Sequence, residues 1–178
     1  MQLKPQDILF LLKLVAIDNR AWTYNSLALE LGLSPSEVHS AAKRAVESRL
    51  AIKEGNKIRV NPQNLVEFLS HGVQYCFIAE RSGITRGVPT AYAAPPLRDK
   101  LVEDSAPPPV WPDPDGEVRG EALAPLHKSI PLAAKKDARL YELLALIDSI
   151  RIGNAREKAI AKKELKSRIE KYGKNTKS

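Results

Sequence analysis

The side chains best suited to binding chemistry are small hydroxyl groups, one imidazole and several cations, which gather between residues 34 and 59. Hydroxyl and imidazole groups form hydrogen bonds with base edges, whereas Lys and Arg neutralise phosphates. The candidate contact residues of this kind are Ser34, Ser36, His39, Ser40, Lys43, Arg44, Lys53, Lys57 and Arg59. Their types favour contact with a nucleic acid over catalysis.

The rest of the sequence offers little for catalysis or for a metal ion. The three histidines, His39, His71 and His127, are far apart in the sequence. A metal site built from His71 and Cys76 would lack two further ligands at a sensible spacing. No glycine loop with the spacing of a phosphate-binding motif is present. We therefore expect no enzyme activity, no catalytic residue, no metal site and no cofactor.

Three helices are expected to position the candidate residues. Pro5 falls in the first turn of the first helix, where its missing N–H costs nothing. Thr23 is suited to cap the second helix, and Gly32 is suited to end it in a left-handed conformation. Ser34 begins the third helix, with Glu37 three residues later as the partner in a capping box. The third helix is predicted over about residues 34–48.

The apolar side of this third helix fixes which residues face outward. Its inward positions are Val38, Ala41, Ala42 and Ala45. Ser36, His39 and Ser40 then lie on the outer sides near the start of the helix, which in a helix-turn-helix meets the bases. Lys43 and Arg44 lie where phosphates pass.

A β-hairpin is predicted after the third helix. Gly55-Asn56 lies between two short alternating segments, which is typical of a tight turn between two strands. A hairpin after three helices makes a winged helix. The wing, about residues 53–60, carries Lys53, Lys57 and Arg59 toward the flanking backbone or the minor groove.

From residue 5 to about residue 70 the sequence resembles the winged helix-turn-helix family of bacterial regulators, particularly MarR-like proteins. The resemblance rests on residues 27–34 (Leu-Ala-Leu-Glu-Leu-Gly-Leu-Ser), on Val38 with Ala42-Lys43-Arg44, and on the Gly55-Asn56 turn. It implies binding of double-stranded DNA, usually as a homodimer on a palindrome. Family members often carry an arginine where Ser40 stands here, so direct base readout is expected to be weak.

Charge is distributed unevenly along the chain, whose net charge of +7 favours an acidic partner. Residues 1–60 hold nine Lys or Arg against six Asp or Glu, and residues 134–178 hold thirteen against six. Residues 61–133 hold six against nine. The basic excess therefore lies at the two ends of the chain.

The middle of the chain is rich in proline. Ten of the thirteen prolines lie between residues 83 and 133, which excludes long helices there. We expect an extended connector over residues 81–133 that joins a DNA-binding domain, residues 1–80, to a separate C-terminal unit, residues 134–178. Parts of the connector, around Trp111 for example, are expected to pack on a surface.

The C-terminal unit is predicted to be a helical hairpin. Asp137 is suited to cap a helix whose apolar stripe consists of Leu140, Leu143, Leu144, Ile147 and Ile150. A break at Gly153 separates it from a second, strongly basic helix. The sequence thus predicts a mainly α protein: an N-terminal winged helix-turn-helix, a proline-rich connector and a C-terminal basic αα-hairpin.

Two functions remain open at this point. The first is a transcriptional regulator that binds DNA. The second is a protein-interaction adaptor, or an antitoxin-like regulator of a defence or toxin module, that binds a partner through residues 134–178. The single cysteine, Cys76, and the absence of a signal peptide or a membrane-spanning run favour a cytoplasmic protein with no membrane contact.

Overall fold

The computed structural model describes residues 1–101 and 105–175, and over these residues the chain is mixed α/β and mostly helical. The first elements are α1 (Pro5–Ile17), α2 (Tyr24–Leu31), α3 (Pro35–Glu47), β1 (Ala51–Glu54), β2 (Lys57–Val60), α4 (Pro62–His71) and α5 (Val73–Cys76). They are followed by β3 (Arg81–Pro89), the 3-10 turn η1 (Ala91–Ala93), β4 (Pro109–Pro112), β5 (Val118–Leu123), α6 (Ile130–Lys136), α7 (Ala138–Ile152) and α8 (Ala155–Asn175).

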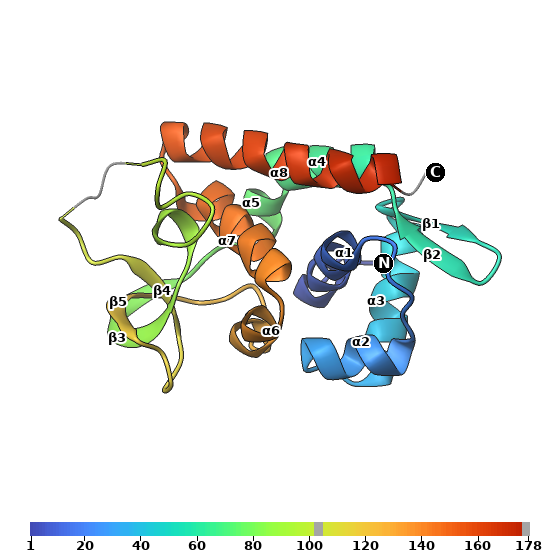
Figure 1. Ribbon diagram of the computed structural model, residues 1–178, viewed down its shortest axis with the longest axis horizontal. Helices are drawn as coiled ribbons and strands as arrows, with labels where there is room; N and C mark the ends of the chain where they lie inside the picture. The colour runs from blue at the N-terminus through green and yellow to red at the C-terminus, as the bar shows by residue number, and fades with distance from the viewer. Residues whose placement is uncertain (102–104, 176–178) are drawn as a thin grey trace.

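The two β-structures lie at opposite ends of the molecule. Figure 1 shows β3, β4 and β5 at one end, the β1–β2 hairpin at the other, and α8 running along the side between them. Helix α1 lies in the middle, where it contacts α3, α7 and α8. Every residue of α1 from Asp7 to Ala16 is buried, so neighbouring elements cover all sides of this helix along that length.

The predicted caps of the N-terminal helices are present. The Thr23 hydroxyl accepts a hydrogen bond from the Ser26 backbone, and the Ser34 hydroxyl accepts one from the Glu37 backbone. Gly32 ends α2 with a φ of +66°, a conformation that glycine adopts at little cost. The inward side of α3 is buried as predicted, at Val38, Ala41, Ala42 and Ala45.

The predicted hairpin is also present. Strands β1 and β2 pair antiparallel from Ala51↔Val60 to Glu54↔Lys57, and Gly55 turns the chain with a φ of +60°. Helix α4, which follows the hairpin, ends at His71. A Cβ at Gly72 would lie 2.9 Å from the Phe68 ring, so this glycine allows the chain to turn closely against α4 before the short α5.

The proline-rich segment is not an extended connector, because much of it forms a small sheet. Strand β3 pairs antiparallel with both β4 and β5, and β4 pairs parallel with β5, so each strand contacts the other two. Pro89 ends β3, and Pro109 and Pro112 begin and end β4. Proline cannot donate to a ladder but is tolerated at strand ends, which is why these prolines delimit the strands.

Glycines make the close approach of these strands possible. A Cβ at Gly87 would lie 2.0 Å from the Trp111 carbonyl oxygen, and one at Gly120 would lie 2.0 Å from that of Pro108. No side chain fits at either position. The sheet therefore depends on glycine where its paired strands approach most closely.

A buried polar network fastens this sheet to α7. The Asp148 carboxylate accepts hydrogen bonds of 2.7 Å from the Thr90 hydroxyl and the Trp111 indole, and one of 2.9 Å from Arg151. Arg151 also donates to the Phe77 carbonyl oxygen. Burial raises the pKa of the Asp148 carboxyl even with these donors around it. Every charged member of the network has a partner.

The C-terminal helical hairpin is confirmed, but it is part of the main core. Asp137 caps α7, and α8 buries Ala161, Leu165, Ile169 and Tyr172. Helix α7 is covered by α1, α5, α6, α8 and η1, so its apolar stripe packs within this chain. One hydrophobic cluster extends from Ile8 to Tyr172.

A buried ion pair network joins the N-terminal helices to this hairpin. Lys13 in α1 is 2% exposed, and its ammonium lies 2.7 Å from carboxylate oxygens of both Glu30 and Asp137. These two residues belong to α2 and to the cap of α7.

No helix in the described residues is long and apolar enough to cross a membrane.

Candidate nucleic-acid interface

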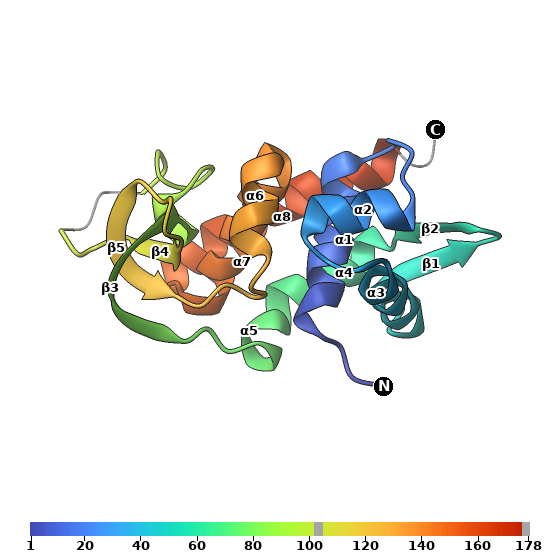
Figure 2. The same ribbon diagram turned by 90° about the horizontal axis from the view of Figure 1, so that it is seen from below.

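The outer side of α3 presents most of the predicted contact residues to solvent. Ser34, Ser36, His39, Ser40 and Lys43 are exposed, whereas the opposite side of the helix is buried and α3 packs on α1. The Lys43 side chain is 78% exposed and its ammonium lies 4.0 Å from Glu47. Figure 2 shows α3 on the outside of the molecule, beside the hairpin.

The serines at the start of α3 are partly engaged in its cap. The Ser34 and Ser36 hydroxyls lie 3.1 Å apart, and the Glu37 carboxylate accepts a hydrogen bond of 2.7 Å from the Ser34 backbone. That backbone hydrogen bond, followed by one from the Ser34 side chain, lowers the pKa of Glu37. Ser40, one turn further along, has no such role in the cap.

His39 is held by an aromatic residue that the sequence reasoning missed. Its ring stacks on Tyr24 with a centroid separation of 3.6 Å and an interplanar angle of 19°. Tyr24 contacts Trp22 edge-on, and Trp22 contacts Phe10 in the same way. This row of rings connects the core to α3 and fixes the orientation of the imidazole. The sequence feature that could have indicated this contact is an aromatic residue, Tyr24, at the first position of α2.

Arg44 does not lie on the outer side of α3, so this part of the prediction is wrong. Its guanidinium forms hydrogen bonds of 2.7–3.0 Å with both carboxylate oxygens of Asp7, which is fully buried. The Arg44 side chain is only 17% exposed. The hydrogen bond with Asp7 raises the pKa of the guanidinium further. Arg44 joins α3 to α1 and is not available to a phosphate in this conformation.

The hairpin presents two free cations and one paired cation. Lys53 and Lys57 are exposed and form no ion pair within the described residues. Arg59 is bound to Glu54 on the neighbouring strand. Its Nε atom is buried and has no hydrogen-bond partner in the described part of the chain. Lys53 and Lys57 are therefore the stronger candidates for contact with a phosphate backbone.

A groove separates the hairpin from the loop between α1 and α2. Its volume is about 560 Å³, and its walls include Trp22, Tyr24, Lys57, Arg59 and Arg20. Arg20 forms two hydrogen bonds with Glu30, of 2.8 and 2.9 Å. The groove thus joins the start of α2, which carries Tyr24, to the turn and β2 of the hairpin.

A further cation lies near the start of α3. The close approach of Gly32 to Ser129 places residues 127–129 beside the turn between α2 and α3. Lys128 in this segment is exposed, and its charge acts on the Glu37 carboxylate. No pattern in the sequence indicated this neighbour, because Lys128 follows Glu37 by 91 positions.

Comparisons of the chain with protein-family models, with curated proteins and with solved structures found no match. Among the described residues, no group of three or more His, Cys, Asp or Glu is arranged to hold a metal ion.

Proposed function

We propose that this protein binds double-stranded DNA as a transcriptional regulator, through a winged helix-turn-helix formed by α1, α2, α3 and the β1–β2 hairpin. The observation that carries the proposal is the two-sided character of α3. One side is buried in the core, and the other presents short polar groups and Lys43 beside a hairpin with two free lysines.

In the proposed complex α3 lies in the major groove. Ser36, His39 and Ser40 face base edges from the first half of the helix, and Lys43 reaches a phosphate. Lys53 and Lys57 on the hairpin contact the flanking backbone. No arginine projects from α3 toward the bases, since Arg44 is bound to Asp7. The affinity of the complex is therefore expected to depend more on contacts with phosphates than on contacts with bases.

The resemblance to MarR-like regulators supports binding as a homodimer. Two copies on a palindrome would place two α3 helices in successive major grooves, about 34 Å apart. Each copy would contribute three exposed cations, Lys43, Lys53 and Lys57, which together give about six phosphate contacts.

An adaptor that binds a partner through residues 134–178 receives less support from the geometry. Helix α7 is covered on its sides by other helices of this chain, so it has no apolar face to offer. A partner of this segment would have to contact the outer side of α8.

A double substitution tests the proposed interface. We expect Lys43→Ala with Lys57→Ala to weaken binding to a duplex from the region upstream of the protein's own gene by about tenfold or more, because it removes two phosphate contacts from each copy. Fluorescence anisotropy at a fixed salt concentration measures the change. Both side chains are exposed, so the free energy of unfolding should be unchanged.

The matched control is Arg86→Ala with Arg119→Ala. These residues face each other on β3 and β5, at the far end of the molecule, and are exposed. The control removes the same number of positive charges and should bind the duplex almost as tightly as the unmodified protein does. Equal losses in the two variants would show that only net charge matters and would contradict the proposal.

A further inference from the structure

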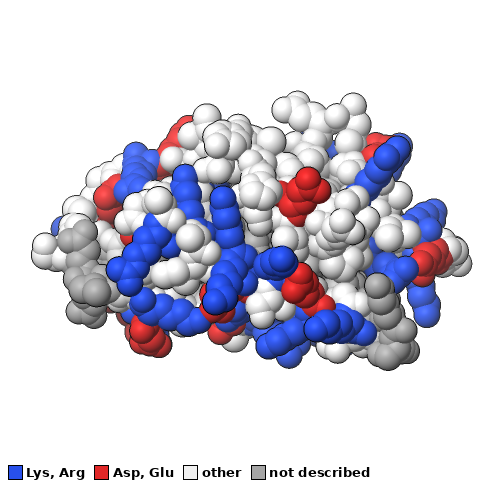
Figure 3. Space-filling view, turned by 90° about the horizontal axis from the view of Figure 1, so that it is seen from above, with Lys and Arg blue, Asp and Glu red and all other residues white. Residues whose placement is uncertain are grey.

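The outer side of α8 is a strongly basic surface. Helix α8 contains eight Lys or Arg and three Asp or Glu. Its buried stripe turns a set of basic side chains to solvent, namely Arg156, Lys163, Lys166, Lys171 and Lys174. Figure 3 shows Lys and Arg side chains gathered over this face.

Most of these cations lack a carboxylate partner. Glu164 is bound to both Lys100 and Arg168, and Glu157 is occupied by the cap at Asn154. Glu170 lies 3.8 Å from Lys166. Within the described residues, Lys163, Lys171 and Lys174 form no ion pair. The outer side of α8 therefore has a local excess of positive charge with little internal compensation.

The shape of this surface also suits an anion. Four of the lysines, together with Ser167 and Glu170, line a shallow hollow of about 290 Å³ on α8. From Arg156 to Lys174 the cations extend over about 27 Å of helix, given a rise of 1.5 Å per residue. A linear polyanion could contact several of them at once.

The chemistry favours a sugar-phosphate backbone over an acidic protein. Protein interfaces usually centre on buried aromatic or large apolar anchors. In the described part of α8, no large apolar side chain is exposed, and the outer side consists of charged residues with Ala and Ser. Phosphate contacts need no such anchor, because cations alone supply the affinity.

This surface and α3 face different directions. Helix α1 lies between them and contacts α3 as well as α7 and α8. Figures 1 and 2 show α8 along one side of the molecule and α3 on another. The C-terminal end of α8 lies beside the hairpin, where Gly173 approaches Pro62, but its N-terminal half extends away from the hairpin. A straight duplex bound to α3 and the hairpin would not cover that half of α8.

We propose that the outer side of α8 binds the phosphate backbone of a second DNA duplex segment, independently of base sequence. The protein then holds two segments together, one on α3 and one on α8. The bridging rests on the function proposed above, whereas binding of a duplex to α8 does not.

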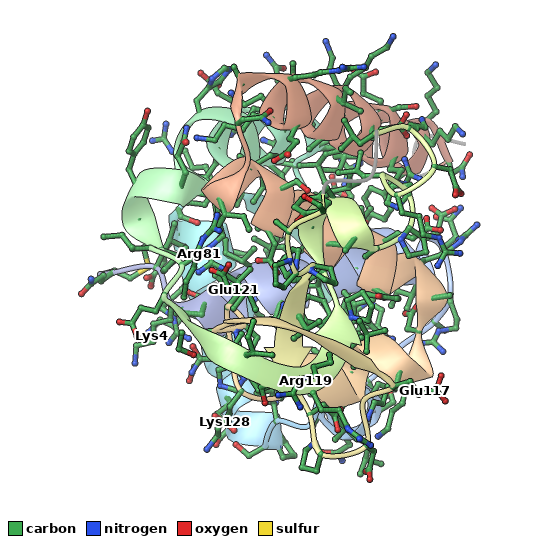
Figure 4. The ribbon with its side chains drawn as sticks, turned by 90° about the vertical axis from the view of Figure 1, so that its left-hand side faces the viewer. Lys4, Arg81, Glu117, Arg119, Glu121 and Lys128 are labelled. Carbon is green, nitrogen blue, oxygen red and sulfur yellow. The ribbon has the colours of Figure 1, made fainter. Side chains whose placement is uncertain are left out.

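The test is association of two short duplexes with different fluorescent labels, followed by energy transfer between them. Each duplex has about 20 base pairs, too short to reach both surfaces by bending. The full-length protein is expected to bring the labels together. Arg156→Glu with Lys163→Glu should reduce the energy transfer at least about tenfold while most binding of a single duplex remains, because both residues are exposed on the half of α8 away from the hairpin. Arg86→Glu with Arg119→Glu changes the net charge equally and should leave the energy transfer unchanged. Figure 4 shows Arg119 on the sheet, away from α8.

Several outcomes would overturn the inference. The inference fails if the unmodified protein gives no energy transfer. It also fails if the energy transfer persists in the α8 variant, because a dimer that bridges two duplexes through its two α3 helices would give that result. An equal loss of energy transfer in the control variant would also contradict it.

The Lys43→Ala, Lys57→Ala variant separates the two proposals. If that variant binds a single duplex normally while the α8 variant does not, the α3 interface fails and the α8 surface stands.

Discussion

Replacing Arg44 by alanine is expected to lower the free energy of unfolding by about 3–5 kcal/mol. The reason is that Asp7 is fully buried and both of its carboxylate oxygens accept hydrogen bonds from this guanidinium. Removing Arg44 leaves a buried charge without its partner. Urea unfolding followed by circular dichroism measures the loss.

The neighbouring residue provides a matched control. Lys43 is 78% exposed, and Lys43→Ala should change the free energy of unfolding by no more than about 0.5 kcal/mol. Arg44→Lys should fall between the two, since an ammonium keeps the charge but not the paired hydrogen bonds. If Arg44→Ala proved as stable as Lys43→Ala and bound DNA more weakly, Arg44 would be a contact residue after all.

Replacing Asp148 by alanine is expected to cost a similar amount, about 3–5 kcal/mol. The substitution leaves Arg151, which is 3% exposed, without its carboxylate, and it removes the acceptor for the Trp111 indole and the Thr90 hydroxyl. Because these groups join the β3–β5 sheet to α7, the sheet should lose its attachment first. Hydrogen exchange of the sheet amides would detect this.

Asp148→Asn separates the loss of charge from the loss of hydrogen bonds. The Thr90 and Trp111 donors share one carboxylate oxygen, and an amide oxygen can take its place. The asparagine variant should therefore retain part of the stability and most of the sheet protection. Equal unfolding free energies for the alanine variant and the unmodified protein would show that the network is not needed.

Much of the N-terminal fold could be predicted because its signals are local. Thr23, Gly32 and Ser34 act within one turn of their own helices, and the Gly55 turn acts on the strands beside it. Arg44 could not be placed in the same way. It lies at the edge of the apolar side of α3, and only the position of α1 reveals that its side chain reaches Asp7.

The β3–β5 sheet could not be predicted because its determinants are not local. The prolines excluded long helices correctly, but the same residues also mark strand ends. The more specific signal was the set of glycines, since Gly87 and Gly120 lie where a side chain would collide with another strand. That requirement becomes visible only once the strands are paired. The attachment through Asp148 is likewise invisible in the helical pattern of α7.

The proposed DNA contact is tested most directly by the salt dependence of binding. With about six phosphate contacts in a dimer, the affinity for a 20-base-pair duplex should fall by about 10³-fold or more between 50 and 200 mM salt. The Lys43→Ala, Lys57→Ala variant should give a clearly shallower slope in the same titration. An affinity that does not change with salt, or a slope that is the same in the variant, would contradict binding through α3 and the hairpin.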